Sequence, residues 1–328
     1  MIISKTPVRI SFFGGGTDYP DHYKQHGGAV LSTSIDKYIF ITVKSLEGLL
    51  EYKYRIAYSK LELCNDVEEI QHPVVKACIK FLEIEEGLEV NIISDLPART
   101  GIGSSSSFTV GLLNALYALK GKMVSKEQLA HEAIHIEQVV LGERVGVQDQ
   151  CAAAFGSLNQ MSFEPSGRIL VNPVIVSDER KNQLQKNLIM FYTGVSRYAH
   201  QVLEEQIQKT KENKITPDLN RIKQMVSDGL DIICNGKDLK LFGELMHEGW
   251  TAKKSLSSAI SNNFLDDIYE RARNAGAIGG KLLGAGGGGF FVFYVEESQR
   301  DGVRKALAEL PEIPFRFEND GTRIIFFS

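Results

Sequence analysis

The chain has 328 residues, of which 43% are hydrophobic and 24% charged, a composition typical of a soluble globular protein with one large domain or two medium ones. Its net charge of −4, without a large basic block, argues against nucleic-acid binding and against attraction to an anionic membrane. Four widely spaced cysteines, and no run near the roughly 20 apolar residues that span a bilayer, predict a cytoplasmic protein with reduced thiols.

In chain order, the first half of the sequence mixes predicted strands and helices. Alternating, β-branched and aromatic segments predict strands at residues 2–12, 37–45, 51–58, 88–94, 157–163 and 168–174. Helical patterns occupy residues 73–86, 103–120, 125–142 and 146–155. Ser125, followed three residues later by Gln128, has the pattern of a capping box at the start of the third of these helices.

The pattern changes near residue 178. Helices are predicted after it at residues 198–212, 218–234, 238–256 and 263–275. Strands at 289–295, 313–318 and 323–327 follow, with a helix at 298–309 between the first two. The sequence therefore predicts an α+β fold in two parts, residues 1–180 and residues 181–328.

The sharpest local signal is the segment DLPARTGIGSSSS at residues 95–107. Two glycines, Gly101 and Gly103, let the backbone approach a ligand closely, and the helix that follows offers unpaired N–H groups to an anion. Four successive serines add hydroxyls for phosphate or Mg²⁺, whereas a plain helix cap needs only one. The segment matches neither the GxxxxGK[ST] nor the GxGxxG pattern of other phosphate loops.

Two more glycine-rich segments stand near the two ends of the chain. PVRISFFGGGTDY at residues 7–19 places Arg9 inside an apolar strand, where a guanidinium needs a partner, either in a site or in a structural ion pair. KLLGAGGGGF at residues 281–290 precedes a predicted strand. Alone, this last run is explained equally well by backbone N–H groups near a ligand and by a flexible loop.

In their order and spacing, the three segments resemble the three motifs of the galactokinase, homoserine kinase, mevalonate kinase and phosphomevalonate kinase superfamily, the GHMP kinases, over nearly the whole chain. The family's middle motif reads close to PxxxGLGSSA, and here Ile102 and Ser106 replace the Leu and the Ala. The first motif is most similar to that of bacterial kinases that act on D-glycero-D-manno-heptose 7-phosphate at the anomeric carbon. Galactokinases have Glu and His where this chain has Gly15 and Gly16.

The resemblance implies a two-domain fold, with a ribosomal S5 domain 2-like N-terminal domain, a ferredoxin-like C-terminal domain and a cleft between them. It implies that Asp149 is the catalytic base and that Arg9 stabilises charge on the transferring phosphoryl group; the alternative for Asp149 is an N-terminal helix cap. Mg²⁺ would bind Ser105 and Glu137, although a lone helix glutamate is more often solvated.

The implied ligand contacts fall into two sets. The phosphates of ATP would bind Pro97, Gly101, Ile102, Gly103, Ser104, Ser105, Ser106 and Ser107. The acceptor would bind Gly15, Gly16, Thr17, Asp18, Arg197, Gly286 and Gly287. For Arg197, a surface arginine at a helix start is the equal alternative.

The predicted function is an ATP- and Mg²⁺-dependent sugar kinase that converts D-glycero-D-manno-heptose 7-phosphate to the 1,7-bisphosphate. Its expected partner is this small sugar phosphate, with no nucleic acid and no membrane, and its expected assembly is a monomer or a homodimer. The alternatives are a kinase for another sugar such as fucose, a non-catalytic ATP and sugar sensor, and a diphosphate decarboxylase. Arg9, Glu137 and Asp149 argue against the sensor, and the sugar-kinase-like first motif argues against the decarboxylase.

Overall fold

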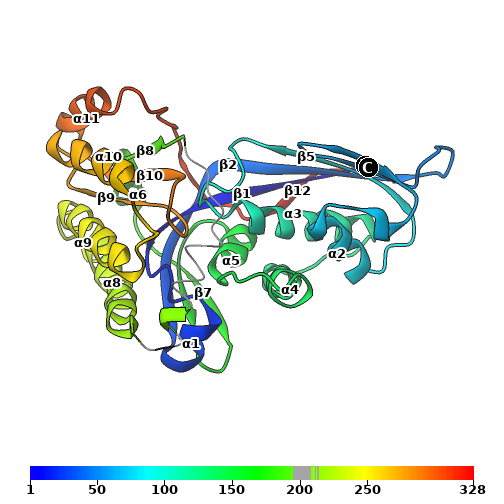
Figure 1. Cartoon of the computed structure of the whole chain (residues 1–328), viewed down its shortest axis with the longest axis horizontal. Coiled ribbons are helices and arrows are strands. Elements are labelled where there is room, and N and C mark those ends of the chain that lie inside the picture. The colour runs from blue at the N-terminus through cyan, green and yellow to red at the C-terminus, as the bar shows by residue number, and fades with distance from the viewer. Residues whose placement is uncertain (195–207, 211, 213) are drawn as a thin grey trace.

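The computed structural model describes residues 1–194, 208–210, 212 and 214–328 (Figure 1). Its larger sheet runs in the order β12-β1-β2-β5-β3-β4, and β6 and β11 also pair with β2, while β7 pairs with β6. The strands are β1 (Ile2–Phe13), β2 (Gly28–Leu46), β3 (Tyr54–Ala57), β4 (Leu61–Cys64), β5 (Gly87–Ser94), β6 (Leu158–Phe163), β7 (Ile169–Pro173), β11 (Phe317–Glu318) and β12 (Arg323–Phe327). β2 has 19 residues, and this length lets it hold β1 along one edge and three other strands in succession.

Helices cover one face of this sheet (Figure 1). They are α2 (Pro73–Phe81), α3 (Ser104–Leu119), α4 (Lys126–His135) and α5 (Gln148–Phe155). A 3₁₀ turn at Val67–Glu69 precedes α2, and the short helix α1 (Pro20–His26) lies apart from α2 and α4 (Figure 1). α3 packs against β1 and β2 and is apolar on nearly all sides, as expected of a helix inside the core.

The smaller sheet has the antiparallel order β8-β10-β9, with β8 (Leu188–Tyr192), β9 (Gly279–Leu282) and β10 (Phe290–Tyr294). Around it lie α6 (Asp178–Lys186), α8 (Thr216–Cys234), α9 (Lys240–Leu256), α10 (Asn263–Asn274), a 3₁₀ turn at Glu297–Gln299 and α11 (Arg300–Ala306). The two parts share a packed core. In that core, Phe12 and Phe13 of β1 make edge contacts with Phe242 of α9, with ring centroids 5.3 and 5.0 Å apart.

The α+β fold class is confirmed, and most predicted elements are present with shifted ends. The predicted helix at 73–86 stops at Phe81, the predicted strand at 313–318 shrinks to Phe317–Glu318, and the predicted helix at 198–212 falls almost entirely outside the described residues. Ser125 accepts from the Gln128 backbone as predicted. The Gln128 side chain instead donates to Tyr117 and Glu132, so the capping box is half formed.

Several elements were not predicted, namely α1, α6, β4, β8 and β9. The sequence pattern did not predict β8 because it is a five-residue apolar run in a helical region, and it did not predict β9 because half of its residues are glycine. The division at residue 180 stays a prediction, and beside it β11 and β12 return from the C-terminal end to pair with β2 and β1. Among the described residues, no helix is long and apolar enough to cross a bilayer.

Candidate functional site

A cleft of about 900 Å³ takes its lining from both parts of the fold. The predicted site residues that line it come from β1, the following glycine turn, the starts of α3 and α5, and the loop after β9. They are Arg9, Gly15, Gly16, Asp18, Gly101, Gly103, Ser104, Ser105, Ser106, Asp149 and Gly286. Segments up to 277 residues apart in the sequence therefore converge on one cavity, as the three glycine motifs predicted.

Other predicted site residues do not line this cleft. They are Pro97, which is exposed, and the buried Thr17, Ile102, Ser107, Glu137 and Gly287, while Arg197 lies outside the described residues. Two of the buried positions have structural partners. The Ser107 hydroxyl donates to the Pro7 carbonyl at 2.8 Å, and the Gly287 N–H donates to the Ile260 carbonyl at 2.9 Å.

Arg9 and Asp149 both line the cleft and form a two-pronged ion pair. Arg9 Nε and Nη2 donate to the two carboxylate oxygens of Asp149 at 2.8 and 3.0 Å, and Nη1 donates to the Gly101 carbonyl at 2.6 Å. Arg9 is buried, whereas the Asp149 side chain is 25% exposed and faces the cavity. This geometry fixes the carboxylate next to the glycine-serine loop. Asp149 sits in the first turn of α5, and its carboxylate is used by Arg9 rather than as a helix cap.

The glycine-serine loop is built for close backbone contact. Gly101 and Gly103 have φ of +81° and +76°, a conformation that favours glycine. Gly103 is also the N-cap of α3, and no side chain caps that helix end. The first N–H groups of a 16-residue helix therefore point toward the cleft with the positive end of the helix dipole, which suits an anion.

The third glycine segment packs directly onto this loop. A Cβ on Gly284 would lie 2.3 Å from Gly101 Cα, and one on Gly289 would lie 2.2 Å from the Thr100 carbonyl oxygen. Neither position can accept a side chain without moving backbone. The glycines at 284–289 thus serve a rigid contact between the two parts of the fold, rather than a loose loop.

Glu137 lies in a π-helical turn, Ile136–Val140, that continues α4, a feature often found at functional sites. Ser106 Oγ donates to Glu137 Oε2 at 2.9 Å, and Gln150 Nε2 donates to the same oxygen at 2.6 Å. Joint binding of Mg²⁺ by Ser105 and Glu137 stays a prediction. Ser105 is exposed to the cleft because successive residues of a helix point about 100° apart.

The residues around Glu137 fit a magnesium ion in their chemistry. Glu137 Oε1 is fully buried without a hydrogen-bond partner in the described part of the chain, since the nearby Thr109 hydroxyl donates to the Ser105 carbonyl. Within the same residues, no three His, Cys, Asp or Glu side chains gather. Mg²⁺ typically takes one or two protein oxygens and completes its shell with phosphate and water, so one buried carboxylate beside serine hydroxyls is a suitable set.

Asp18 and Thr17 follow the first glycine turn and play different parts. Asp18 Oδ1 accepts from the Gly16 N–H at 3.0 Å, and its other oxygen accepts from the Gln148 N–H at 3.3 Å. Burial, together with the negative charge of Asp149, raises the pKa of Asp18 to about 6. Thr17 is fully buried, and its hydroxyl bonds the Gly14 and Ala29 carbonyls, so in this structure it holds the turn.

Two lysines in the cleft were missed by sequence reasoning. Lys253 of α9 and Lys281 of β9 both line the cavity. Lys281 Nζ donates to the Phe12 carbonyl at 2.9 Å, and Lys253 Nζ donates to the Leu282 carbonyl at 3.0 Å and to the Gly284 carbonyl. Lys281 begins the third glycine-rich segment, KLLGAGGGGF, so its position next to that motif is a signal in the sequence. Lys253 has no local signal, because it is one lysine on an ordinary amphipathic helix.

An aromatic end of the cleft was also missed. Tyr58, His72 and Phe108 line the cavity and contact one another in series, with ring centroids 4.9 Å apart in both neighbouring pairs. Ile39 and Ile92 also line the cavity. A flat apolar group could lie among these side chains while its charged remainder reaches the start of α3.

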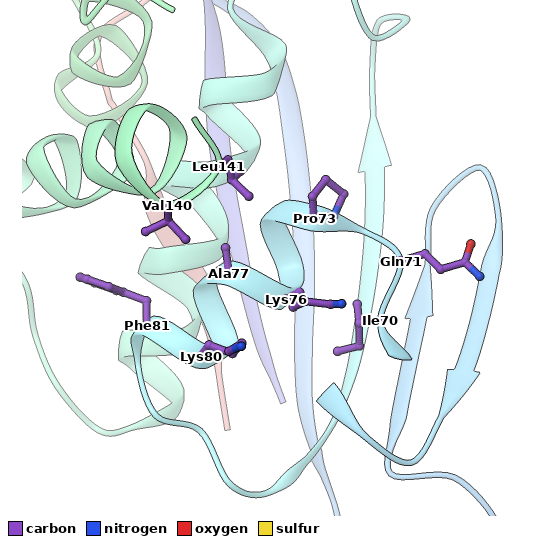
Figure 2. A pocket seen from close by; sticks show the side chains of 9 residues that line it. All are labelled: Ile70, Gln71, Pro73, Lys76, Ala77, Lys80, Phe81, Val140 and Leu141. Atoms are coloured by element: carbon purple, nitrogen blue, oxygen red, sulfur yellow. The ribbon is translucent and has the colours of Figure 1, made fainter. Parts of the chain in front are cut away.

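A smaller pocket of about 490 Å³ lies between α2 and the π-helical turn (Figure 2). Its lining is Ile70, Gln71, Pro73, Lys76, Ala77, Lys80, Phe81, Val140 and Leu141. None of these is a predicted site residue. Both lysines are already engaged by Glu68, through its carboxylate and its backbone carbonyl. The larger cleft is therefore the candidate site.

The buried Glu137 makes stability depend on pH. Burial raises its pKa to about 7 from an ordinary 4.5, against the opposing effect of the nearby Thr109, Ser106 and Gln150 side chains. The folded state then holds the proton more tightly than the unfolded state, so this group's contribution to stability falls as pH rises from 4.5 through 7. The glutamine of Glu137→Gln does not ionise. As pH rises from 5 to 8, the free energy of unfolding of this variant is therefore expected to increase relative to that of the wild type by up to about 3 kcal/mol.

Urea unfolding of both proteins in metal-free buffer, at pH values between 5 and 8, measures this difference. Parallel stability curves for wild type and Glu137→Gln would contradict it. Because Asp18 has a raised pKa as well, the wild-type slope is not expected to vanish in the variant, only to decrease.

Comparisons with known proteins give a consistent result. The GHMP kinases N terminal domain matches residues 72–157, and the GHMP kinases C terminal domain matches residues 230–312. The chain is 30% identical over 315 residues to a D-glycero-alpha-D-manno-heptose 7-phosphate kinase from Campylobacter jejuni, covering 93% of each protein. It is 25% identical to a bifunctional fucokinase/GDP-fucose pyrophosphorylase from Arabidopsis thaliana, covering 95% of this chain and 32% of that protein.

A solved structure gives the same picture at the level of the fold. A D-glycero-D-manno-heptose 1-phosphate kinase from Bacteroides thetaiotaomicron superposes with a TM-score of 0.80 and 26% identity, over 100% of both chains.

Proposed function

Because the chain belongs to the GHMP kinases and is a sugar kinase, we propose that it transfers the γ-phosphoryl group of ATP to the anomeric hydroxyl of D-glycero-D-manno-heptose 7-phosphate. The observation that carries this proposal is the Arg9–Asp149 pair, held against the glycine-serine loop in the cleft. A base and a cation beside an anion site are what phosphoryl transfer to a hydroxyl requires.

In the proposed phosphoryl transfer one bond to the γ-phosphorus forms and one breaks. The acceptor oxygen forms a bond to the γ-phosphorus, the bond from that phosphorus to the β–γ bridging oxygen breaks, and its electron pair leaves with ADP. The acceptor's proton goes to Asp149, whose oxygens keep free lone pairs while Arg9 orients them. The Arg9 guanidinium and the N–H groups at the start of α3 offset the negative charge of the phosphates.

The acceptor is proposed from the relatives together with the site. The Campylobacter relative and the Bacteroides structure carry heptose kinase names, and they differ in which phosphate the name contains. Asp18, aimed at the cleft with two backbone donors holding it, is suited to accept hydrogen bonds from sugar hydroxyls. Fucose is the second candidate, because fucokinase sequences also align over almost the whole of this chain.

GHMP kinases use ATP, and we propose that its adenine lies among Tyr58, His72 and Phe108. Mg²⁺, when bound by Glu137 and the adjoining serines, would neutralise phosphate charge. Gly15, Gly16 and Gly286 are proposed to contact the acceptor. A cytoplasmic monomer or homodimer, with its two parts dividing near residue 180, completes the proposal.

Tyr58→Ala tests the adenine position. Loss of one stacking face is expected to raise the KM for ATP about tenfold while kcat at saturating ATP changes less than about twofold. Steady-state kinetics with varied ATP measure both constants. The matched control is Tyr52→Ala, a change outside the cleft. Equal kinetic constants for the two variants would mean that the adenine of ATP binds elsewhere.

The function itself is tested by ADP release from Mg-ATP with a panel of acceptors. The panel contains D-glycero-D-manno-heptose 7-phosphate, the corresponding 1-phosphate, mannose 6-phosphate, fucose and galactose. Turnover on the 7-phosphate, with the product's new phosphate assigned to C1 by ³¹P NMR, supports the proposal. Turnover only on the 1-phosphate or only on a free sugar would overturn the acceptor assignment, and ligand binding without any turnover would favour a sensor.

A further inference from the structure

We propose that Lys253, from helix α9, is a further catalytic residue that contacts the γ-phosphoryl group during its transfer. This assignment rests on the proposed function, because it presupposes that a nucleotide triphosphate occupies the cleft. It adds a cation from the second part of the fold to the Arg9–Asp149 pair of the first part.

The position of Lys253 is fixed by backbone contacts. Its Nζ donates to the carbonyls of Leu282 and Gly284, which leaves one ammonium proton for a further acceptor. Gly284 in turn packs backbone to backbone on Gly101, since a Cβ built on Gly101 would come within 2.4 Å of the Leu283 carbonyl oxygen. The ammonium group is therefore held on the segment that touches the phosphate loop.

The packing of Gly284 against Gly101 places this ammonium near the catalytic pair. Arg9 Nη1 donates to that carbonyl at 2.6 Å while its other nitrogens hold Asp149. Lys253 and Arg9 thus bind the two adjoining backbone segments, from opposite parts of the fold. A group that accepts from both cations would lie beside Asp149, where the proposed acceptor oxygen meets the γ-phosphorus.

Lys253 has no anionic partner among the described residues of the cleft. The charge of Arg9 is matched by Asp149, but no carboxylate within 4 Å pairs with Lys253 or with Lys281 among the described residues. Burial, with the nearby charge of Arg9, lowers the pKa of Lys253 to about 7, and burial beside Lys253 and Arg9 lowers that of Lys281 well below its ordinary value. An unpaired buried cation is costly, so a phosphoryl oxygen is the acceptor that fits.

The transferring phosphoryl group is favoured over a phosphate carried by the acceptor. In a loose transition state the negative charge spreads over the three equatorial oxygens of the moving group, and cations fixed around it stabilise that charge directly. An acceptor's own phosphate lies at the far end of the sugar from the attacking oxygen. Lys253 is held at Gly284, whose backbone packs on Gly101 of the phosphate loop, so its ammonium group is placed toward the donor's phosphates.

The neighbouring residue provides a matched control. Lys254 follows Lys253 on α9 but pairs with Asp266 of α10 at 3.0 Å and does not line the cleft. Lys253→Met is expected to lower kcat about 100-fold, and Lys253→Arg to recover part of that loss. Lys254→Met is expected to keep wild-type kinetics.

Titration calorimetry with AMP-PNP and with ADP, both in the presence of MgCl₂, supplies a readout besides turnover. Lys253→Met is expected to bind AMP-PNP about tenfold more weakly and ADP within about twofold of the wild type, because only AMP-PNP has a γ-phosphoryl group. Equal weakening for both nucleotides, or a rise confined to the KM of the acceptor, would overturn the proposal. If Lys253→Met does not fold, Lys253→Gln replaces it in the same measurements.

The two proposals can fail separately. A wild-type protein without turnover on any sugar would refute the proposed function. The comparison between AMP-PNP and ADP would still decide whether Lys253 recognises the γ-phosphoryl group.

Discussion

Asp149→Asn is expected to lower kcat about 10³-fold while the nucleotide still binds. The amide cannot take the proton of the attacking hydroxyl, and it can accept only one of the two hydrogen bonds that Arg9 donates at present. Arg9 keeps its bond to the Gly101 carbonyl, so the phosphate loop should hold its shape. ADP release at saturating substrates measures kcat, and calorimetry measures the retained binding.

The control for this change is Asp267→Asn, which alters an exposed carboxylate in an ion pair with Arg271. It is expected to leave kcat unchanged. Should Asp149→Asn retain more than a tenth of the wild-type kcat, the base would have to be another group. Asp18 would be the first to examine, because it lines the same cleft and its pKa of about 6 suits proton transfer near neutral pH.

Gly101→Ala is expected to destabilise the protein and to abolish tight nucleotide binding. Its φ of +81° costs an alanine about 1 kcal/mol, and the new Cβ would lie 2.4 Å from the Leu283 carbonyl oxygen and 2.8 Å from the Leu283 carbonyl carbon. Backbone atoms cannot swing aside as a flexible side chain can, so the two loops must separate. We expect a total loss of about 3 kcal/mol in the free energy of unfolding.

Gly121→Ala separates the two causes of this loss. Gly121 has a φ of +66°, but a Cβ added there would meet nothing within 4 Å, so alanine incurs the conformational cost without the clash. Its expected cost is about 1 kcal/mol, with normal nucleotide binding. Urea unfolding and calorimetry on both variants measure these differences. Equal destabilisation of the two would mean that the packing of Gly101 on the loop after β9 contributes nothing.

Much of the candidate site could be predicted because its residues stand in a few short segments of the sequence. The run from Gly101 to Ser107 predicts a phosphate site from glycine conformation and from the start of a helix, properties of a few consecutive residues. Arg9, in an apolar strand, predicts a buried partner, and Asp149 is that partner in the structure. Alternating and helical patterns likewise predicted most strands and helices of the larger part, because each pattern reflects which face of an element is buried.

The sequence by itself therefore determined the family and the fold class, and it predicted that Arg9 lies near Asp149 and that the glycine-serine loop is an anion site. Only the tertiary structure decided which serine meets Glu137, because that depends on the rotation of α3 relative to the π-helical turn. Only it brought Lys253 to the cleft, since a lysine on α9 acquires its place from how that helix packs on the loop after β9. Local patterns report the exposure of a residue's own element, whereas such contacts depend on the relative placement of elements far apart in the chain.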